Sequence, residues 1–168
     1  NKIIVEGISN LSRQKSFSYE YLLRTAQTTA EFKGDCLINQ GEIVKGVWKF
    51  VEDTIQTEII ALYNTQYERK GDDWEIHSRG EESNILVQIE RALKRDKFEF
   101  LRKEDSKYVY AFKPNLLFLD PTMKKEIRAV IGISSRNHLP IYIHAISADS
   151  LIYWKVGLNQ FNKSYIIN

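Results

Sequence analysis

The chain has 168 residues, 43% of them hydrophobic and 27% charged, which is the composition of one globular domain with its own core. Its net charge of +2, spread over interleaved acidic and basic residues, excludes the concentrated basic surface of a nucleic-acid-binding protein. No apolar run reaches the roughly 18 residues of a membrane-spanning helix, and a single cysteine, Cys36, excludes an internal disulfide. We expect Cys36 to be a small buried hydrophobic residue.

The N-terminal part predicts one helix followed by strands. Within Lys2–Ser12 the apolar residues fall on one stripe at helical spacing: Ile3, Ile4, Ile8 and Leu11. From Phe17 to Arg24 the period of the pattern changes to two, which is typical of a strand. Glu31–Asn39 and Ile43–Val51 follow as two more strands, and the turn residues Asn39–Glu42 between them predict a hairpin.

The segment Thr54–Arg69 is ambiguous, because Glu58–Tyr63 has the propensity for a helix. Its density of Thr and Ile, and the turn Lys70–Asp73 that follows, favour a strand that leads into Trp74–His77.

Glu81–Asp96 gives the clearest helical pattern. Its apolar residues share one face: Ile85, Leu86, Ile89, Ala92 and Leu93. Acidic residues precede the segment and Lys94 and Arg95 end it, as the helix dipole favours. This apolar face is expected to pack on a sheet.

The remainder of the chain predicts mostly strands. Phe98–Leu101 and Tyr108–Phe112 form a hairpin around the polar turn Lys103–Ser106, and the short apolar segment Leu116–Leu119 allows a turn of helix into Met123. Three strands close the chain: Glu126–Ser134, and two within Ile141–Asn162 that follow the turn Ser135–Pro140. No catalytic cluster lies on these last strands.

About nine to eleven strands with short connections, together with two or three helices, indicate an α+β fold. We expect residues 1–168 to form a single domain. Its core would be one large, curved, antiparallel sheet, an unclosed β-barrel covered by the helices on one side.

Candidate chemistry is sparse. The three histidines, His77, His138 and His144, lack the close spacing and the cysteine or acidic neighbours of a metal site, and we expect them on exposed strands. The carboxylate pairs Asp72–Asp73 and Glu81–Glu82 lie at a turn and at a helix start, where acidic residues have local roles.

The sequence around Ser134 lacks the glycine pattern of a nucleophile elbow, and no phosphate-binding glycine motif occurs. We therefore expect no enzymatic activity, no metal and no cofactor. The aromatic and basic residues of Lys107–Lys113 are compatible with nucleic-acid stacking, but half-buried strand packing explains them better.

Some strands are apolar on both faces, as in Ile59–Leu62, Ala129–Ile131 and Leu151–Trp154. One face is expected to meet the helices. The other would meet either a second layer of the protein or a lipid-like ligand, and packing within the protein alone also accounts for the pattern.

The order of elements resembles the bacterial lipoprotein-carrier superfamily, the LolA-like outer-membrane lipoprotein-sorting proteins. The similarity runs over most of the chain and rests on these segments: Phe17–Thr25, Phe32–Gly34, the Tyr67–Trp74 hairpin before the central helix, Tyr108–Pro114, Leu139–Ile141 after a Ser-Arg-Asn-His turn, and Phe161–Asn162.

The resemblance implies an extracytoplasmic protein of the periplasm or cell envelope that binds a lipid or a lipoprotein acyl chain without catalysis, as in transport. The implied cavity would be lined by inward residues of the strands and of the covering helix: Trp48, Phe50, Leu62, Ile85, Leu86, Ile89, Ile131, Ile133, Ile152 and Trp154. The alternative is a module of the same fold with a self-filled core and no ligand, which acts on an envelope protein.

The chain begins with Asn1 rather than Met. We therefore expect a trimmed chain, a processed chain or both, and a lipid anchor at an upstream N-terminus is the only membrane association that the resemblance implies.

Overall fold

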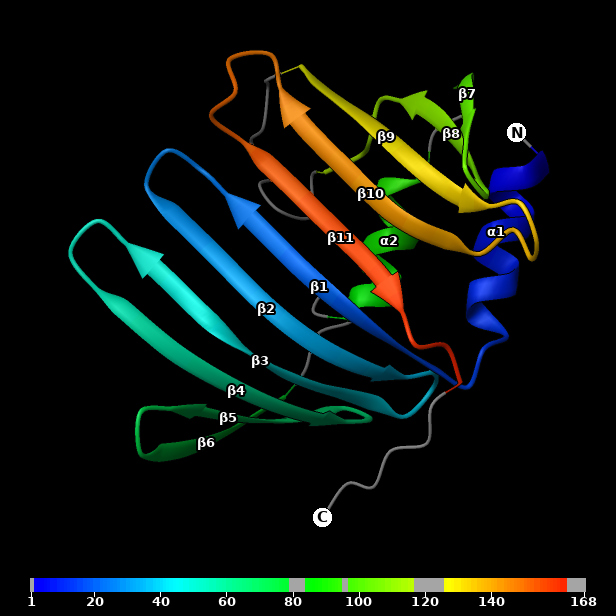
Figure 1. The fold of residues 1–168 in the computed structure, drawn as a ribbon. Helices are drawn as coiled ribbons and strands as arrows, with labels where there is room; N and C mark the ends of the chain where they lie inside the picture. Colours follow the sequence, from blue (N-terminus) through cyan, green and yellow to red (C-terminus); the bar gives the residue numbers. More distant parts are fainter. Residues whose placement is uncertain (1, 79–83, 95–96, 117–125, 163–168) are drawn as a thin grey trace.

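The computed structural model describes residues 2–78, 84–94, 97–116 and 126–162, which form two helices and one antiparallel sheet (Figure 1). The helices are α1 (Lys2–Ser12) and α2 (Ile85–Ala92). The strands are β1 (Ser16–Arg24), β2 (Thr28–Leu37), β3 (Gly41–Phe50), β4 (Thr54–Leu62), β5 (Thr65–Lys70), β6 (Asp73–Ser78), β7 (Phe98–Glu104), β8 (Lys107–Phe112), β9 (Ile127–Ser134), β10 (Pro140–Ser147) and β11 (Tyr153–Asn159).

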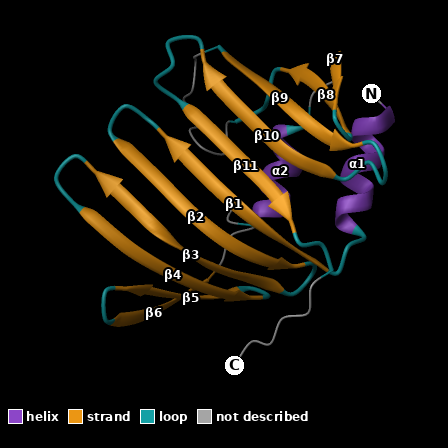
Figure 2. Cartoon of the chain, viewed as in Figure 1, coloured by secondary structure: helices purple, strands orange, loops and turns teal. Residues whose placement is uncertain are grey.

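The sheet has 11 strands in the order β6-β5-β4-β3-β2-β1-β11-β10-β9-β8-β7. Every pair of neighbours is consecutive in the chain except β1 and β11, which join the N-terminal and C-terminal halves. Strands β6 and β7 stand at the two ends of this order, so the curved sheet remains an unclosed barrel within the described residues. Both helices lie on the same side of it (Figure 2).

The alternation of β1 defines the two faces of the sheet. Phe17 and Tyr19 are buried on the side of the helices, which we call the helix face, whereas Ser18 and Glu20 point to the opposite side, the outer face. Because the strands are in register, this assignment extends across the sheet from β1 in both directions.

Helix α1 is held on the turn between β9 and β10. Asn10 Nδ2 donates a hydrogen bond to the carbonyl oxygen of Asn137 at 2.9 Å, and His138 Nδ1 lies 3.1 Å from Glu6 Oε2. A Cβ at Gly7 would come within 2.6 Å of the carbonyl oxygen of His138, so the helix approaches the turn as closely as glycine allows.

The predicted architecture is confirmed, with local differences. The segment Thr54–Arg69 is not one strand but two, because Tyr63 takes a positive φ of 54° and starts a tight turn. The central helix begins only at Ile85, since Asn84 caps it with an extended backbone, and it ends at Ala92 with Leu93 as its C-cap. The predicted helical turn from Leu116 into Met123 lies, beyond Leu116, outside the described residues.

Candidate functional site

The helix face consists of a packed part and an open part. Under β8–β11 and the helices lies a core of fully buried side chains: Phe17, Ile85, Ile89, Ile131, Ile133, Ile143, Trp154 and Val156. On β2 to β4 the large apolar side chains of the same face are only half-buried, among them Phe32, Trp48 and Ile55. The open part is therefore where the helix face can still bury apolar surface.

Five aromatic side chains form a continuous row across β11, β1, β2 and β3, which we call the aromatic row: Trp154, Tyr21, Phe32, Trp48 and Phe50. Successive ring centroids lie 6.4, 6.3, 5.5 and 6.2 Å apart. Exposure rises along the row from 0% at Trp154 to 45% at Phe50. The row thus leads from the core to the surface as an apolar path about three strand spacings, or roughly 15 Å, long.

The Tyr21 hydroxyl lies in the largely buried inner part of this row. Burial raises the pKa of Tyr21 to about 12, and a hydrogen bond with the Trp154 side chain opposes the rise only in part. The phenol therefore stays neutral at physiological pH and brings no charge to the row.

The structure brings together most of the residues predicted to line a cavity, but in two environments. Ile85, Ile89, Ile131, Ile133 and Trp154 are fully buried in the core. Trp48 and Phe50 lie in the open part, and Leu86 is half-buried on α2.

Two other predicted residues lie apart from this face. Leu62 pairs with Gly41, one residue beyond Ala61, so the alternation of β4 places it on the outer face. Ile152 belongs to the turn before β11, where its amide donates a hydrogen bond to Ser147 Oγ at 3.0 Å.

Helix α2 is attached to the sheet through a buried carboxylate. Glu42, only 1% exposed, accepts a hydrogen bond from the backbone amide of Ile85 at 2.7 Å and one from the Tyr19 hydroxyl at 3.2 Å. Asn84 Oδ1 accepts from the amides of Leu86 and Val87 in the same first turn. Glu42 thus fixes the first turn of α2 to the sheet, a role that the alternating pattern of a strand does not predict for a glutamate.

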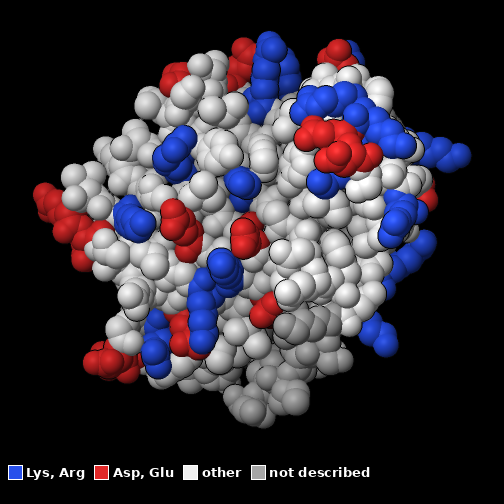
Figure 3. Space-filling view, viewed as in Figure 1, with Lys and Arg blue, Asp and Glu red and all other residues white. Residues whose placement is uncertain are grey.

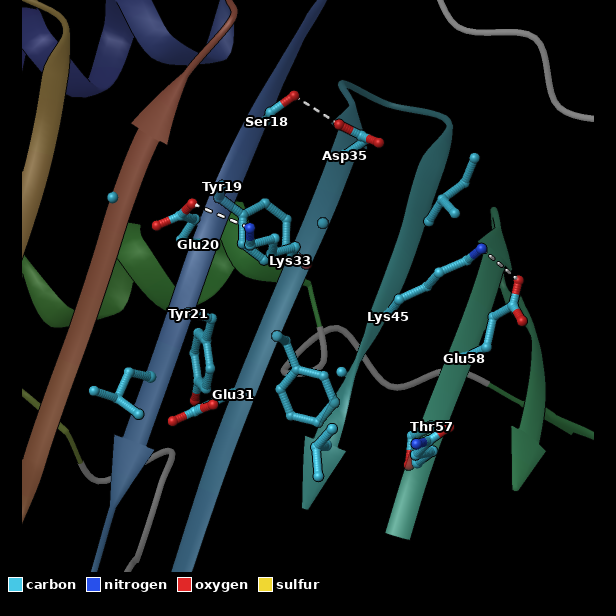
Figure 4. A pocket seen from close by; sticks show the side chains of 18 of the residues that line it. Ser18, Tyr19, Glu20, Tyr21, Glu31, Lys33, Asp35, Lys45, Thr57 and Glu58 are labelled. Atoms are coloured by element: carbon cyan, nitrogen blue, oxygen red, sulfur yellow. Dashed lines mark hydrogen bonds and ion pairs between the residues drawn. The ribbon is translucent and has the colours of Figure 1, made fainter. Parts of the chain in front are cut away.

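A groove of about 1280 Å³ lies on the outer face, lined by β1–β5 and β11. Its lining residues include a row in register across six strands: Gly157, Glu20, Lys33, Lys45, Glu58 and Arg69. Figure 4 shows two ion pairs of this row, Lys33 with Glu20 at 3.8 Å and Lys45 with Glu58 at 3.6 Å. The groove is polar and differs from the apolar cavity predicted from the sequence.

The charges of the outer face are mixed. Figure 3 shows basic and acidic side chains interspersed over the strands, and the groove is lined by four acidic and four basic residues. This balance gives the groove no net charge with which to attract a strongly charged partner over a distance.

Among the described residues no group of three or more His, Cys, Asp or Glu side chains could hold a metal ion. The prediction of exposed strand histidines holds only for His77: His138 lies in the β9–β10 turn against Glu6, and His144 is half-buried, its pKa lowered by burial and by Lys155. Cys36 is buried, as predicted.

No described helix is both long enough and apolar enough to span a membrane.

The unclosed barrel with both helices on one face gives the chain a LolA-like fold, the architecture predicted from the sequence. No protein-family model and no curated protein sequence matches the chain.

Solved structures are similar to it in fold. LprF from Mycobacterium bovis aligns with a TM-score of 0.62 at 10% identity, over 99% of this chain and 94% of its own. MucB, in the Pseudomonas aeruginosa MucA/MucB complex, aligns with a TM-score of 0.51 at 8% identity, over 99% of this chain and 58% of that one. A LolA superfamily protein, NE2245 from Nitrosomonas europaea, aligns with a TM-score of 0.43 at 11% identity, over 99% and 94%. At these identities the likeness concerns the fold alone.

Proposed function

We propose that this protein is a non-enzymatic, extracytoplasmic binding protein that holds a lipid or lipoprotein acyl chain against the open part of the helix face. The observation that carries the proposal is the aromatic row, whose rings form a continuous apolar path from the buried Trp154 to the exposed Phe50. The extracytoplasmic location and the lipid class rest on the LolA-like fold and are part of the proposal.

The physical basis is burial of apolar surface. Each Å² removed from water contributes about 25 cal/mol, so covering roughly 200 Å² of chain and rings supplies about 5 kcal/mol before the costs of association. Half-buried aromatic rings suit this role, because they are already ordered by their neighbours and still present apolar surface. No catalytic group is needed for such binding.

Contact quenching of tryptophan fluorescence tests this binding site. Trp48 belongs to the aromatic row, whereas Trp74, 46% exposed, lies on β6 beside Arg69 on the outer face. We expect a fatty acid brominated near its methyl end to quench the emission of the Trp74→Phe variant in a saturable way, because bromine quenches the indole it touches.

The matched control is Trp48→Phe, which keeps Trp74 and should lose most of the saturable quenching. An unbrominated fatty acid should reverse the effect in the wild-type protein. Quenching that disappears in Trp74→Phe but persists in Trp48→Phe would place the ligand on the outer face and contradict the proposal.

A second candidate is an envelope interaction module of the same fold, and the outer groove favours it. Gly157 lies in that groove, and a Cβ there would meet no atom within 4 Å. We expect Gly157→Trp to fold normally and to fill part of the groove. If a protein partner binds there, affinity capture from an envelope extract should retain the partner on wild-type protein and lose it on Gly157→Trp.

Val51→Trp is the matched control for this experiment, since Val51 is 82% exposed at the turn after β3, outside the residues that line the groove. If the wild-type protein, Gly157→Trp and Val51→Trp retain the partner equally, the groove is not the partner site.

A further inference from the structure

Thr57 places a buried hydroxyl group on the helix face. Thr57 of β4 is 4% exposed, and among the described residues its Oγ1 atom has no hydrogen-bond partner. Leaving a buried hydroxyl without a hydrogen bond lowers the stability of the folded state, so folded proteins rarely keep one without a reason.

The surroundings of this hydroxyl belong to the open part of the helix face. Thr57 pairs with Gly46 of β3, and a Cβ at Gly46 would lie 2.2 Å from Phe32 Cδ1, so the Phe32 ring lies over that glycine. Along β4 the neighbours of Thr57 on the same face are Ile55 and Ile59. The hydroxyl therefore borders the aromatic row at its middle ring, between apolar side chains.

An apolar ligand chain that carries one acceptor oxygen could pack against these side chains and accept a hydrogen bond from the Thr57 hydroxyl. We propose that Thr57 donates a hydrogen bond to the carbonyl oxygen of an acyl ester whose chain lies along the aromatic row, with the half-buried Phe32 ring turning to admit it. This inference rests on the proposed function and specifies its ligand. A neutral hydroxyl is suited to a neutral ester carbonyl, because a carboxylate buried beside a single neutral donor would remain poorly compensated.

The affinities of three probes of similar chain length test whether the ligand carries an ester, a carboxylate or no acceptor. The probes are methyl decanoate, decanoic acid and dodecane, each measured by displacement of a fluorescent acyl probe. We expect the wild-type protein to prefer the methyl ester. Thr57→Val should weaken the ester about fivefold, the worth of one neutral hydrogen bond, and leave dodecane unchanged. Thr57→Ser should keep the preference for the ester.

The unliganded protein provides a second readout. Valine has nearly the shape of threonine without the hydroxyl, so Thr57→Val should raise the Tm by about 2–4 °C if the hydroxyl is unpaired. A fall in Tm would show that the hydroxyl is already satisfied and would overturn the inference.

The outcomes also separate the inference from the function it rests on. If dodecane and the ester bind equally well and Thr57→Val changes neither, the acyl site stands and the role of Thr57 is wrong. A stronger effect of Thr57→Val on decanoic acid than on the ester would make the carboxylate the ligand and refute the ester. If no probe binds to the wild-type protein, the proposed function fails and the inference fails with it.

Discussion

Replacing Glu42 by alanine is expected to lower the free energy of unfolding by about 3 kcal/mol. The substitution removes a buried acceptor and leaves the Ile85 amide and the Tyr19 hydroxyl without it. Both donors lie where α2 meets the sheet, so the first turn of the helix should loosen before the core does. Urea unfolding would measure the loss, and amide hydrogen exchange at Ile85 would locate it.

Tyr19→Phe is the control for this prediction, because it removes only the longer of the two hydrogen bonds. We expect it to cost about 1 kcal/mol and to leave the exchange rate at Ile85 nearly unchanged. If Glu42→Ala costs no more than Tyr19→Phe, the bond to α2 does not stabilise the fold and another contact must hold the helix in place.

The alternation of polar and apolar residues was sufficient to predict much of the fold. In β1 it distinguishes the buried Phe17 and Tyr19 from the outward Ser18 and Glu20, and the turn at Asn39 predicts the β2–β3 hairpin, where Asn39 indeed takes a φ of 63°. These features are local, because the alternation of a strand and the residues of a turn depend only on positions a few residues apart in the chain.

The candidate site was harder to predict, because its properties arise between distant segments. Glu42 and Ile85 are 43 residues apart in the chain, and a glutamate in a strand pattern reads as solvent-exposed. The alternation of polar and apolar residues does not predict that Trp154 is fully buried while Trp48 on the same face is not. This difference depends on which segments cover each strand. The polar groove depends on side chains from six strands and had no signal in the sequence.

The two ends of the aromatic row should respond differently to substitution. Trp154→Ala removes a fully buried side chain among core residues and should lower the free energy of unfolding by about 4 kcal/mol. Trp48→Ala removes a half-buried ring and should cost about 1 kcal/mol, yet it should weaken acyl binding about tenfold, because that ring supplies surface to the ligand.

Urea unfolding and displacement of a fluorescent acyl probe measure the two quantities for each variant. This separation of stability from binding follows from the division of the helix face into a packed and an open part, and it discriminates between the two candidate functions. If no ligand occupied the open part, Trp48→Ala would still cost little stability, because the ring is half-buried, but the wild-type protein would show no acyl affinity for the substitution to weaken. Absence of acyl binding to the wild-type protein, or equal binding by wild type and Trp48→Ala, would therefore favour the interaction module, whereas a binding defect in a stable Trp48→Ala protein requires that a ligand occupies the open part.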